Sequence, residues 1–358
     1  MEAVRRRQWI AALTLAFAVA LLLGWGTLSR HVRAAQLLAH FEDSGSTLAG
    51  VEVRDTTLGG CRARVYEGGG PPVLLVHGVH ADGIDEPRLV RFAELLVDAG
   101  FTVATPDITP MREFRLDAAG IEHIADAAAA FAAAEGRPSV GVVGISFGGG
   151  LAILAAAERP EAIHGIWAIG AHHDLVSLAR WWSGGEIRGP GGERPGVEPE
   201  GYGAQVLAYS FADDFFAPAD LEDARVILGA HLRGDSAEAR ALRDAASGPA
   251  RARLREAREP GAPLRELAER HHDALATISP VGRLARVRAR VLLLHGAGDR
   301  VVASTEALHL AAGLPRSEGA LRTSLLGHAD ASGDATWSDR WDLVHHAATA
   351  LDVLAAPR

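Results

Sequence analysis

After residue 50, short apolar runs alternate with stretches of helical periodicity, and this alternation constrains the fold more than any other feature. The apolar runs include PPVLLVHG at 71–78, FTVATPDI at 101–108 and PSVGVVGIS at 138–146. Such βα units build a largely parallel sheet with helices on both faces. Before them, VEVRDTT and CRARVYEG at 51–57 and 61–68 predict an antiparallel pair of strands.

The segment 85–100, DEPRLVRFAELLVDAG, is typical of an amphipathic helix packed on such a sheet. Asp85 is the expected N-cap, Pro87 lies in the first turn, and Gly100 ends the helix. Its apolar positions recur at helical spacing and predict a buried stripe of Leu89, Phe92, Leu95 and Leu96.

The βα rhythm stops at about residue 175 and resumes at about residue 280. We therefore expect a core formed by residues 50–174 and 280–356, with residues 175–279 inserted as a helical cap. Aromatic side chains gather in the insertion and either line an acyl pocket or pack the cap on the core, the second being favoured; they are Trp181, Trp182, Phe211, Phe215 and Phe216.

The N-terminus carries an uncharged stretch from Gln8 to Ser29, and about 20 apolar residues are enough to span a bilayer as a helix. Trp9 and Trp25 lie near its ends, where aromatic rings favour the membrane interface. We expect residues 1–35 to be a membrane anchor, the alternative being a cleaved signal peptide. The slight excess of arginine before the stretch favours a folded body on the outer, periplasmic or extracellular side, secreted or periplasmic if the segment is cleaved.

Composition excludes several classes of function. The chain contains no lysine, which excludes a P-loop lysine, a Schiff-base lysine and a Ser-Lys catalytic pair. The net charge of -9 argues against nucleic-acid binding. Cys61 is the only cysteine, so neither an internal disulfide nor a cysteine metal cluster can form.

Ser146 lies in GVVGISFGGG, between Gly144 and Gly148 and directly after a β-branched run. Flanking glycines allow the sharp strand-to-helix turn that exposes a nucleophilic serine above a sheet. Three further features follow predicted strands: His77-Gly78 after an early strand, Asp299 after VLLLHGAG, and His328 after TSLLG. Each motif is weak alone, and their combination and chain order carry the interpretation.

With these motifs, residues 50–355 resemble the α/β-hydrolase superfamily, in particular serine hydrolases of the dienelactone-hydrolase, esterase and lipase type. The order Ser, Asp, His along the chain is that of this superfamily. The resemblance implies an α/β fold with a mostly parallel central sheet, helices on both faces and a cap.

The resemblance also implies a role for each residue. Ser146 would be the nucleophile, His328 its general base, and Asp299 the carboxylate that orients the imidazole. Backbone N–H groups of Phe147 and Val79 would form the oxyanion hole. Asp174, which follows another predicted strand in GAHHDL, is an alternative to Asp299 as the acid.

The expected activity is carboxylic-ester hydrolysis through an acyl-serine intermediate. Two alternatives stay open: an acyltransferase that uses the same triad, and a non-catalytic member that binds a ligand. We expect no cofactor and no metal, because His172 and His173 lack a partner at metal-ligand spacing. The expected partners are a small-molecule or lipid ester as substrate and the membrane through the N-terminal segment.

Overall fold

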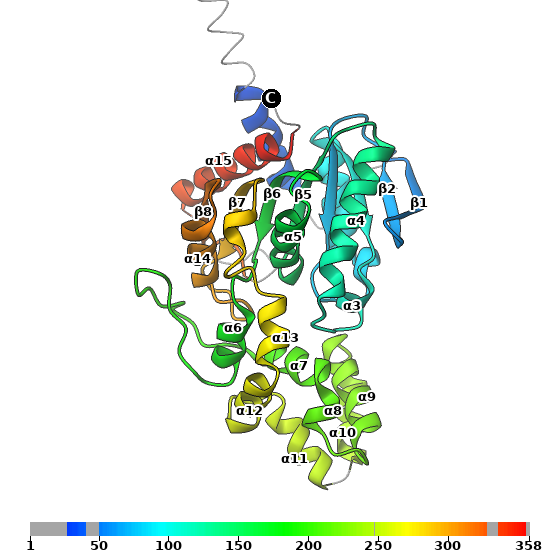
Figure 1. Ribbon diagram of the computed structural model, residues 1–358, viewed down its shortest axis with the longest axis vertical. Helices are drawn as coiled ribbons and strands as arrows, with labels where there is room; N and C mark the ends of the chain where they lie inside the picture. Colours follow the sequence, from blue (N-terminus) through cyan, green and yellow to red (C-terminus); the bar gives the residue numbers. More distant parts are fainter. Residues whose placement is uncertain (1–26, 41–49, 247, 328–335, 356–358) are drawn as a thin grey trace, which may run out of the picture.

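The computed structural model describes residues 27–40, 50–246, 248–327 and 336–355 (Figure 1). An eight-stranded sheet with the order β1-β2-β4-β3-β5-β6-β7-β8 forms its centre. The strands are β1 (Val53–Leu58), β2 (Cys61–Tyr66), β3 (Pro72–Val76), β4 (Thr102–Pro106), β5 (Val140–Ile145), β6 (Ile163–Ile169), β7 (Arg290–Gly296) and β8 (Ser317–Thr323).

The sheet is mostly parallel, as the alternating pattern predicts. β1 pairs antiparallel with β2, and β2 antiparallel with β4, whereas every neighbouring pair from β4 to β8 is parallel. Val76 of β3 is level with Gly144 of β5, so the segments that follow these two strands leave the same edge side by side. Ligand sites of parallel sheets lie outside this carboxyl edge.

Helices cover both faces of the sheet (Figure 1). One hydrophobic cluster joins the sheet to α4 (Ala119–Ala134), α5 (Phe147–Glu158) and α14 (Thr305–Gly313). The other joins it to α2 (Pro87–Asp98), α15 (Trp337–Leu354) and the helix of residues 27–40. Alternate residues of β3 serve the two clusters, since Leu74 belongs to the first and Leu75 to the second.

Helix α2 confirms the predicted stripe, because Leu89, Phe92, Leu95 and Leu96 are all buried. The predicted N-cap, however, is wrong. Glu86 caps the helix by accepting the N–H of Leu89 at 2.8 Å, and Asp85 closes a 3-10 turn, η1 (Gly83–Asp85). The Asp85 carboxylate is instead 2.7 Å from the guanidinium of Arg64 on β2.

Between β6 and β7 the chain forms helices that gather beyond one end of the sheet (Figure 1). They are α6 (Leu175–Trp182), α7 (Gly201–Ser210), α8 (Ala212–Phe215), α9 (Leu221–Leu232), α10 (Ser236–Ala245), α11 (Gly248–Glu256), α12 (Ala262–Arg270) and α13 (His272–Thr277). We call these helices the cap. The short elements α3 (Thr109–Arg112) and η2 (Leu284–Arg286) belong to connections of the core.

The helix of residues 27–40 packs against the core through Ala34 and Leu37, both buried. The expected boundary at residue 35 therefore falls within a continuous helix. In the ranges described above, no helix is long and apolar enough to cross a membrane. The uncharged stretch 8–29 lies outside those ranges except for its last three residues, and the anchor remains a prediction.

Candidate active site

Ser146 occupies a strained turn between β5 and α5. Its φ of 53° and ψ of −127° lie in a region that non-glycine residues rarely adopt. Such strain costs roughly 1–3 kcal/mol and persists only where the surroundings impose it. Here the Ser146 N–H donates to the Ile169 carbonyl at 2.7 Å, and the Ser146 carbonyl accepts the Gly149 N–H at 2.9 Å.

The glycines around Ser146 are required by close backbone approach. A Cβ on Gly144 would lie 2.6 Å from the Cα of Gly149, and one on Gly148 would overlap the carbonyl oxygen of His77. A Cβ on Gly78 would lie 3.2 Å from the Ser146 Cβ, so the loop after β3 lies directly against the serine. The motif therefore brings the turn and the loop into contact.

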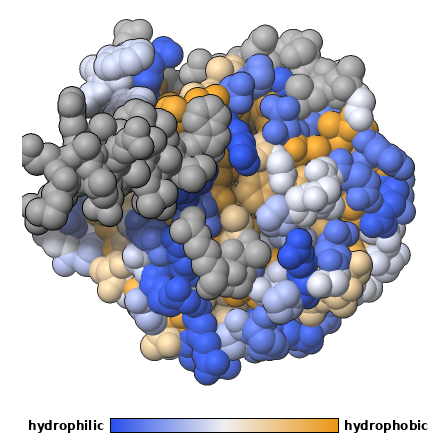
Figure 2. All heavy atoms as spheres, turned by 90° about the horizontal axis from the view of Figure 1, so that it is seen from above, coloured by the Kyte–Doolittle hydropathy of each residue, from blue (hydrophilic) through white to orange (hydrophobic). Residues whose placement is uncertain are grey.

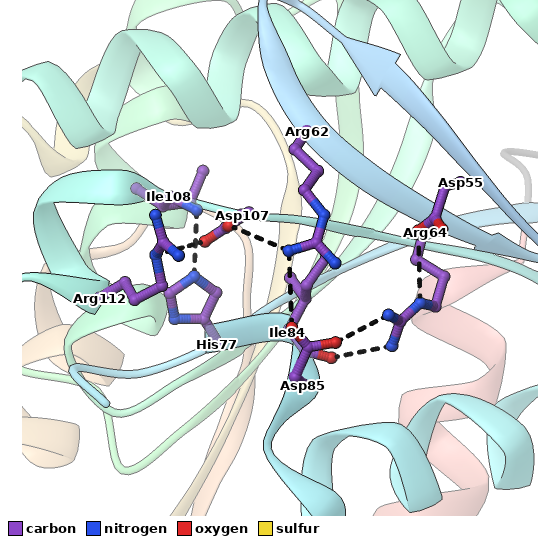
Figure 3. Close-up of polar contacts among 9 residues, drawn as sticks. All are labelled: Asp55, Arg62, Arg64, His77, Ile84, Asp85, Asp107, Ile108 and Arg112. Carbon is purple, nitrogen blue, oxygen red and sulfur yellow. Dashed lines mark hydrogen bonds and ion pairs between the residues drawn. The ribbon is translucent and has the colours of Figure 1, made fainter. Parts of the chain in front are cut away.

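The loop after β3 is held by His77 (Figure 3). Its Nε2 accepts the backbone N–H of Ile108 at 3.1 Å, so Nδ1 carries the proton and donates to the Gly78 carbonyl at 2.6 Å. Burial lowers the pKa of His77, which keeps the ring neutral as this pattern requires. The ring thus fixes the backbone conformation beside Ser146.

Two arginines flank the residue that precedes Ile108 (Figure 3). The buried carboxylate of Asp107 lies 3.4 Å from the Arg112 guanidinium and 3.9 Å from that of Arg62. A second acidic group, Asp85, bridges toward Arg62 and Arg64. These pairs join β2, η1 and α3 around the His77 loop and stabilise its outer side.

Tyr202 of α7 contacts the same loop from the cap. Its hydroxyl donates to the Val79 carbonyl at 2.8 Å, and burial raises the pKa of its phenol. Val79 is one of the two expected oxyanion donors. The other, Phe147, opens α5, so its N–H has no partner within the helix. Sequence reasoning missed Tyr202, because no local pattern links it to a residue 123 positions away.

Asp299 is completely buried in the loop after β7. Its Oδ1 accepts the N–H groups of Val301 and Val302 at 2.8 and 2.9 Å, and its Oδ2 lies 3.2 Å from Nε2 of His295. The same His295 nitrogen lies 2.9 Å from the Val302 carbonyl. The carboxylate is therefore held rigidly at the end of β7, with His295 as a neighbour that the sequence did not reveal.

The alternative acid, Asp174, has a structural task. It caps α6, with Oδ1 accepting the Val176 N–H at 3.0 Å and Oδ2 accepting the Ser177 hydroxyl at 2.6 Å. Both of its carboxylate oxygens are thus used at the start of the cap.

His328 lies outside the described residues. The chain that leads to it is described as far as Gly327, which lines the same cavity as Ser146. A Cβ on Gly296, at the end of β7, would overlap the carbonyl oxygens of Leu326 and Gly327. The segment that follows β8 therefore packs tightly on the end of β7, near the serine.

Ser146 opens into a cavity of about 420 Å³ that also includes Gly78, Val79 and His80. Polar groups at the cavity include Glu86, Arg88, Glu200, Arg233 and the Tyr202 ring. Most of its walls are apolar and come from the helix of residues 27–40, α2, β6 and α15; among them are Leu37, Leu38, Leu89, Phe92, Trp167 and Leu343.

Of the five aromatic residues of the insertion, Trp182 links the cap to the core, whereas Phe211 and Phe215 pack against other residues of the cap. Four of the five, Trp181, Trp182, Phe215 and Phe216, are buried, and Phe211 stacks on His271 with ring centroids 3.8 Å apart. The described walls of the cavity include none of the five. The Trp182 Nε1–H donates to the Val301 carbonyl at 2.8 Å and so links α6 to the Asp299 loop.

The junction between β6 and the cap contains a group of buried titratable side chains. His172 stacks on Phe147 and hydrogen-bonds the Ile278 carbonyl, and burial lowers its pKa to about 4. Glu306 of α14 accepts the N–H groups of His173 and Asp174 at 2.8 and 2.7 Å. Burial raises the pKa of Glu306 to about 8, so at neutral pH it is mostly protonated.

The sheet, the strained serine turn and the glycines around it define a serine hydrolase with the α/β-hydrolase fold. The sequence pattern of the X-Pro dipeptidyl-peptidase (S15) family matches residues 118–330, well over half of the chain, and the chain belongs to this family. This family membership confirms the resemblance to the α/β-hydrolase superfamily. No curated protein matches the chain.

Solved structures with a similar fold include a meta-cleavage product hydrolase from Pseudomonas fluorescens IP01, 18% identical, with a TM-score of 0.46 over 85% of this chain and 97% of that one. A 2-hydroxy-6-oxo-6-phenylhexa-2,4-dienoate hydrolase from Rhodococcus sp. strain RHA1 is 19% identical, with a TM-score of 0.45 over 82% and 96%. A membrane phospholipase A, described as a bacterial virulence factor, is 20% identical, with a TM-score of 0.43 over 97% and 98%.

Proposed function

We propose that the protein is a carboxylic-ester hydrolase that acts through an acyl-serine intermediate on Ser146. The observation that carries this proposal is the strained serine turn, with the His77–Val79 loop against it, opening into a largely apolar cavity. A nucleophile beside backbone donors and an apolar wall suits an acyl group whose carbonyl develops negative charge.

In the proposed reaction, Ser146 Oγ attacks the ester carbonyl while His328 takes its proton. The N–H groups of Phe147 and Val79 stabilise the oxyanion that forms. Collapse of this intermediate breaks the ester bond, and the leaving alcohol receives the proton from His328. Water then loses a proton to His328, attacks the acyl-serine, and releases the carboxylic acid and free Ser146.

Asp299 is the carboxylate we assign to His328. It is buried at the end of β7, and the Leu326-Gly327 segment packs against that end. The cap contacts of Asp174 support this choice, since both of its oxygens already stabilise the start of α6.

The family name raises peptide bonds as an alternative substrate. An enzyme that removes dipeptides must bind a free ammonium group, which calls for an available carboxylate in the cavity. Glu86 is engaged with the Leu89 N–H and with Arg88 at 2.6 Å, whereas Glu200, the second carboxylate at the cavity, makes no side-chain hydrogen bond to cap α7. The largely apolar walls favour a neutral acyl group, and Glu200 is the carboxylate that a peptide N-terminus would use.

The proposal includes the location expected from the sequence. Residues 1–35 would anchor the protein in a membrane, with the catalytic body on the outer side. The uncharged stretch from Gln8 to Ser29 supports the anchor, and the arginines that precede it support the orientation.

A fluorophosphonate probe tests the nucleophile directly in the full chain. We expect the parent to be labelled and Ser146→Ala to be unlabelled. Ser139→Ala is the matched control, because Ser139 precedes the same strand and its hydroxyl lies 3.0 Å from His164 Nδ1, a serine–histidine pair without the strained turn. Labelling of that variant should equal the parent.

Substrate class is tested with a chain-length series of p-nitrophenyl esters beside an Xaa-Pro p-nitroanilide. Hydrolysis of the esters, abolished by Ser146→Ala and by His328→Ala, is the expected result. A folded parent that the probe does not label contradicts the proposal. If the anilide is cleaved faster than every ester, the protein is a peptidase and not an esterase.

A further inference from the structure

The molecule carries an exposed apolar patch on two neighbouring helices. Leu28 and Val32 on the helix of residues 27–40 are 58% and 48% exposed, and Trp337 and Trp341 on α15 are 82% and 56% exposed. Each pair is four residues apart and so lies on one side of its helix. We call these four residues the apolar patch.

The two helices that carry the patch are in contact. The His31 ring stacks on Trp341 with centroids 6.0 Å apart, and its Nε2 lies 3.2 Å from His345 Nδ1. An ion pair between Arg30 and Asp352 joins them further along. The exposed apolar side chains therefore form one surface. Among the described residues, the other exposed large apolar side chains lie apart from one another: Val53 on β1, Val226 on α9 and Val281 in the connection after α13.

The same two helices form the apolar end of the cavity at Ser146. Leu37 and Leu38 of the helix of residues 27–40, and Leu343 of α15, line that cavity. At 1.5 Å per residue, Leu28 lies about 15 Å along the helix from Leu38. The patch on the surface and the wall of the site thus belong to one rigid pair of helices.

The position of the patch leaves it free of the cap. Figure 1 shows the helix of residues 27–40 and α15 at the end of the molecule away from the cap helices. Figure 2, which looks onto that end, shows apolar surface exposed between hydrophilic side chains. Large exposed apolar patches mark interaction surfaces, whereas single apolar residues do not.

The sequence indicates what covers the patch. Leu28 is itself part of the uncharged stretch from Gln8 to Ser29, which leads directly into the helix of residues 27–40. Tryptophan favours the membrane interface, and the two most exposed indole rings among the described residues lie at this surface. A lipid bilayer fits both features, since a long apolar stretch favours the lipid interior and indole rings favour its surface.

We infer that the apolar patch seats the enzyme on a lipid bilayer, and that the cavity takes the acyl chain of a long-chain ester drawn from that bilayer. This inference rests on the proposed ester hydrolysis for its substrate and on the patch for its surface. The end of the cavity at Leu37, Leu38 and Leu343 holds the distal part of the acyl chain. The ester carbonyl then lies at Ser146.

The test compares one ester bond in two settings, using the full chain. 4-Methylumbelliferyl oleate is embedded in phosphatidylcholine vesicles, and 4-methylumbelliferyl butyrate is supplied in solution. We expect Trp337→Ser/Trp341→Ser to hydrolyse the oleate in vesicles at least fivefold more slowly than the parent and the butyrate at an equal rate. Leu28→Ser/Val32→Ser should behave in the same way.

Val226→Ser/Val281→Ser is the matched control, because these side chains are similarly exposed but lie outside the patch. It should hydrolyse both esters like the parent. Leu38→Trp, which shortens the acyl end of the cavity, should move the preference toward shorter esters in detergent micelles. Unchanged oleate hydrolysis in the patch variants, or an equal loss on both esters, overturns the inference.

Quenching of tryptophan emission by brominated lipid tests contact of the apolar patch with the membrane independently of ester hydrolysis. Vesicles of dibrominated phosphatidylcholine should quench less tryptophan emission in Trp337→Phe/Trp341→Phe than in the parent. If no ester is hydrolysed but this difference is seen, the proposed function fails and the membrane surface stands. If quenching is equal and the variant changes the sedimentation coefficient of the detergent-solubilised chain, the patch is a protein interface and the inference is wrong.

Discussion

Ser146 occupies a backbone conformation that costs stability. Its backbone is held at φ 53° by two hydrogen bonds and by the loop after β3, a conformation that glycine adopts without strain. The strain lifts Oγ out of the sheet and toward the cavity. A residue chosen for stability alone would be glycine.

We therefore expect Ser146→Gly to be more stable than Ser146→Ala by about 1 kcal/mol, since alanine keeps the strained Cβ and glycine does not. Both variants lose hydrolysis. Urea unfolding of the two variants beside the parent measures the difference. Equal stability of the glycine and alanine variants would mean that the turn stores little strain.

Tyr202 is a second residue whose single hydrogen bond we expect to affect hydrolysis. Its hydroxyl is the only described side-chain donor to the Val79 carbonyl, and the Val79 N–H is an expected oxyanion donor. The Val79 N–H lies in the preceding peptide plane, with the Gly78 carbonyl that accepts from His77, so the Tyr202 bond holds the next plane and restrains rotation about the Val79 Cα.

Tyr202→Phe should lower kcat about tenfold and leave KM nearly unchanged, because a misdirected oxyanion donor weakens transition-state binding alone. Steady-state kinetics on a soluble short-chain ester provide the measurement. Tyr209→Phe is the control, since Tyr209 lies on the same helix but packs on Phe114. A rise in KM with constant kcat would instead assign Tyr202 to substrate binding.

At the scale of elements, α14 holds the junction between β6 and the cap through the side chain of Glu306. The carboxyl accepts two backbone N–H groups and is buried near Asp174, so the junction contains an acid that stays protonated to about pH 8. His172 and His173 at the same junction have pKa values lowered by burial to about 4 and are neutral above pH 6.5.

Glu306 makes stability depend on pH with a definite sign. Between its ordinary pKa of 4.5 and about 8, the unfolded chain has lost the proton and the folded protein has kept it, so stability falls as pH rises. From pH 7 to 8 this loss should be about 1 kcal/mol. Glu306→Gln keeps the two hydrogen bonds, and urea unfolding at both pH values should show a smaller loss. Equal losses would mean that Glu306 is already ionised at pH 7.

Local sequence patterns predicted the elements well because their causes are local. The alternation of apolar runs predicted most of the strands, and the spacing of Leu89 and Phe92 predicted the buried side of α2. The run TSLLG is an exception, because β8 ends at Thr323 and the residues after it form a turn. The N-cap was missed because Asp85 and Glu86 are both acidic, and only the position of Arg64 on β2 decides which of them pairs elsewhere. That contact arises from the assembled sheet.

At the scale of the whole molecule, the triad of Ser146, Asp299 and His328 stays a prediction: Ser146 and Asp299 follow β5 and β7, and His328 lies outside the described residues. Tyr202 and Glu306 were missed because each contacts a backbone group more than 120 positions away. His295 was missed because its contact with Asp299, four residues further on, depends on the conformation of the chain after β7. The helix of residues 27–40 was missed for another reason: its first residues belong to the uncharged stretch 8–29, which we interpreted as part of a membrane anchor.

That helix belongs to the core of the enzyme as well as to its N-terminal segment. It buries Ala34 and Leu37 against the cluster that contains Phe92 and Leu351, and it supplies a wall of the cavity.

A chain that begins at residue 27 should therefore fold and hydrolyse a soluble short-chain ester like the full chain. One that begins at residue 41 should lose at least about 3 kcal/mol of stability, since burial of one leucine contributes about 1.5–3 kcal/mol. Thermal unfolding and ester hydrolysis of the two truncated chains provide the measurement. Equal melting temperatures would show that the helix rests on the core without supporting it, and would remove its leucines from the wall of the site.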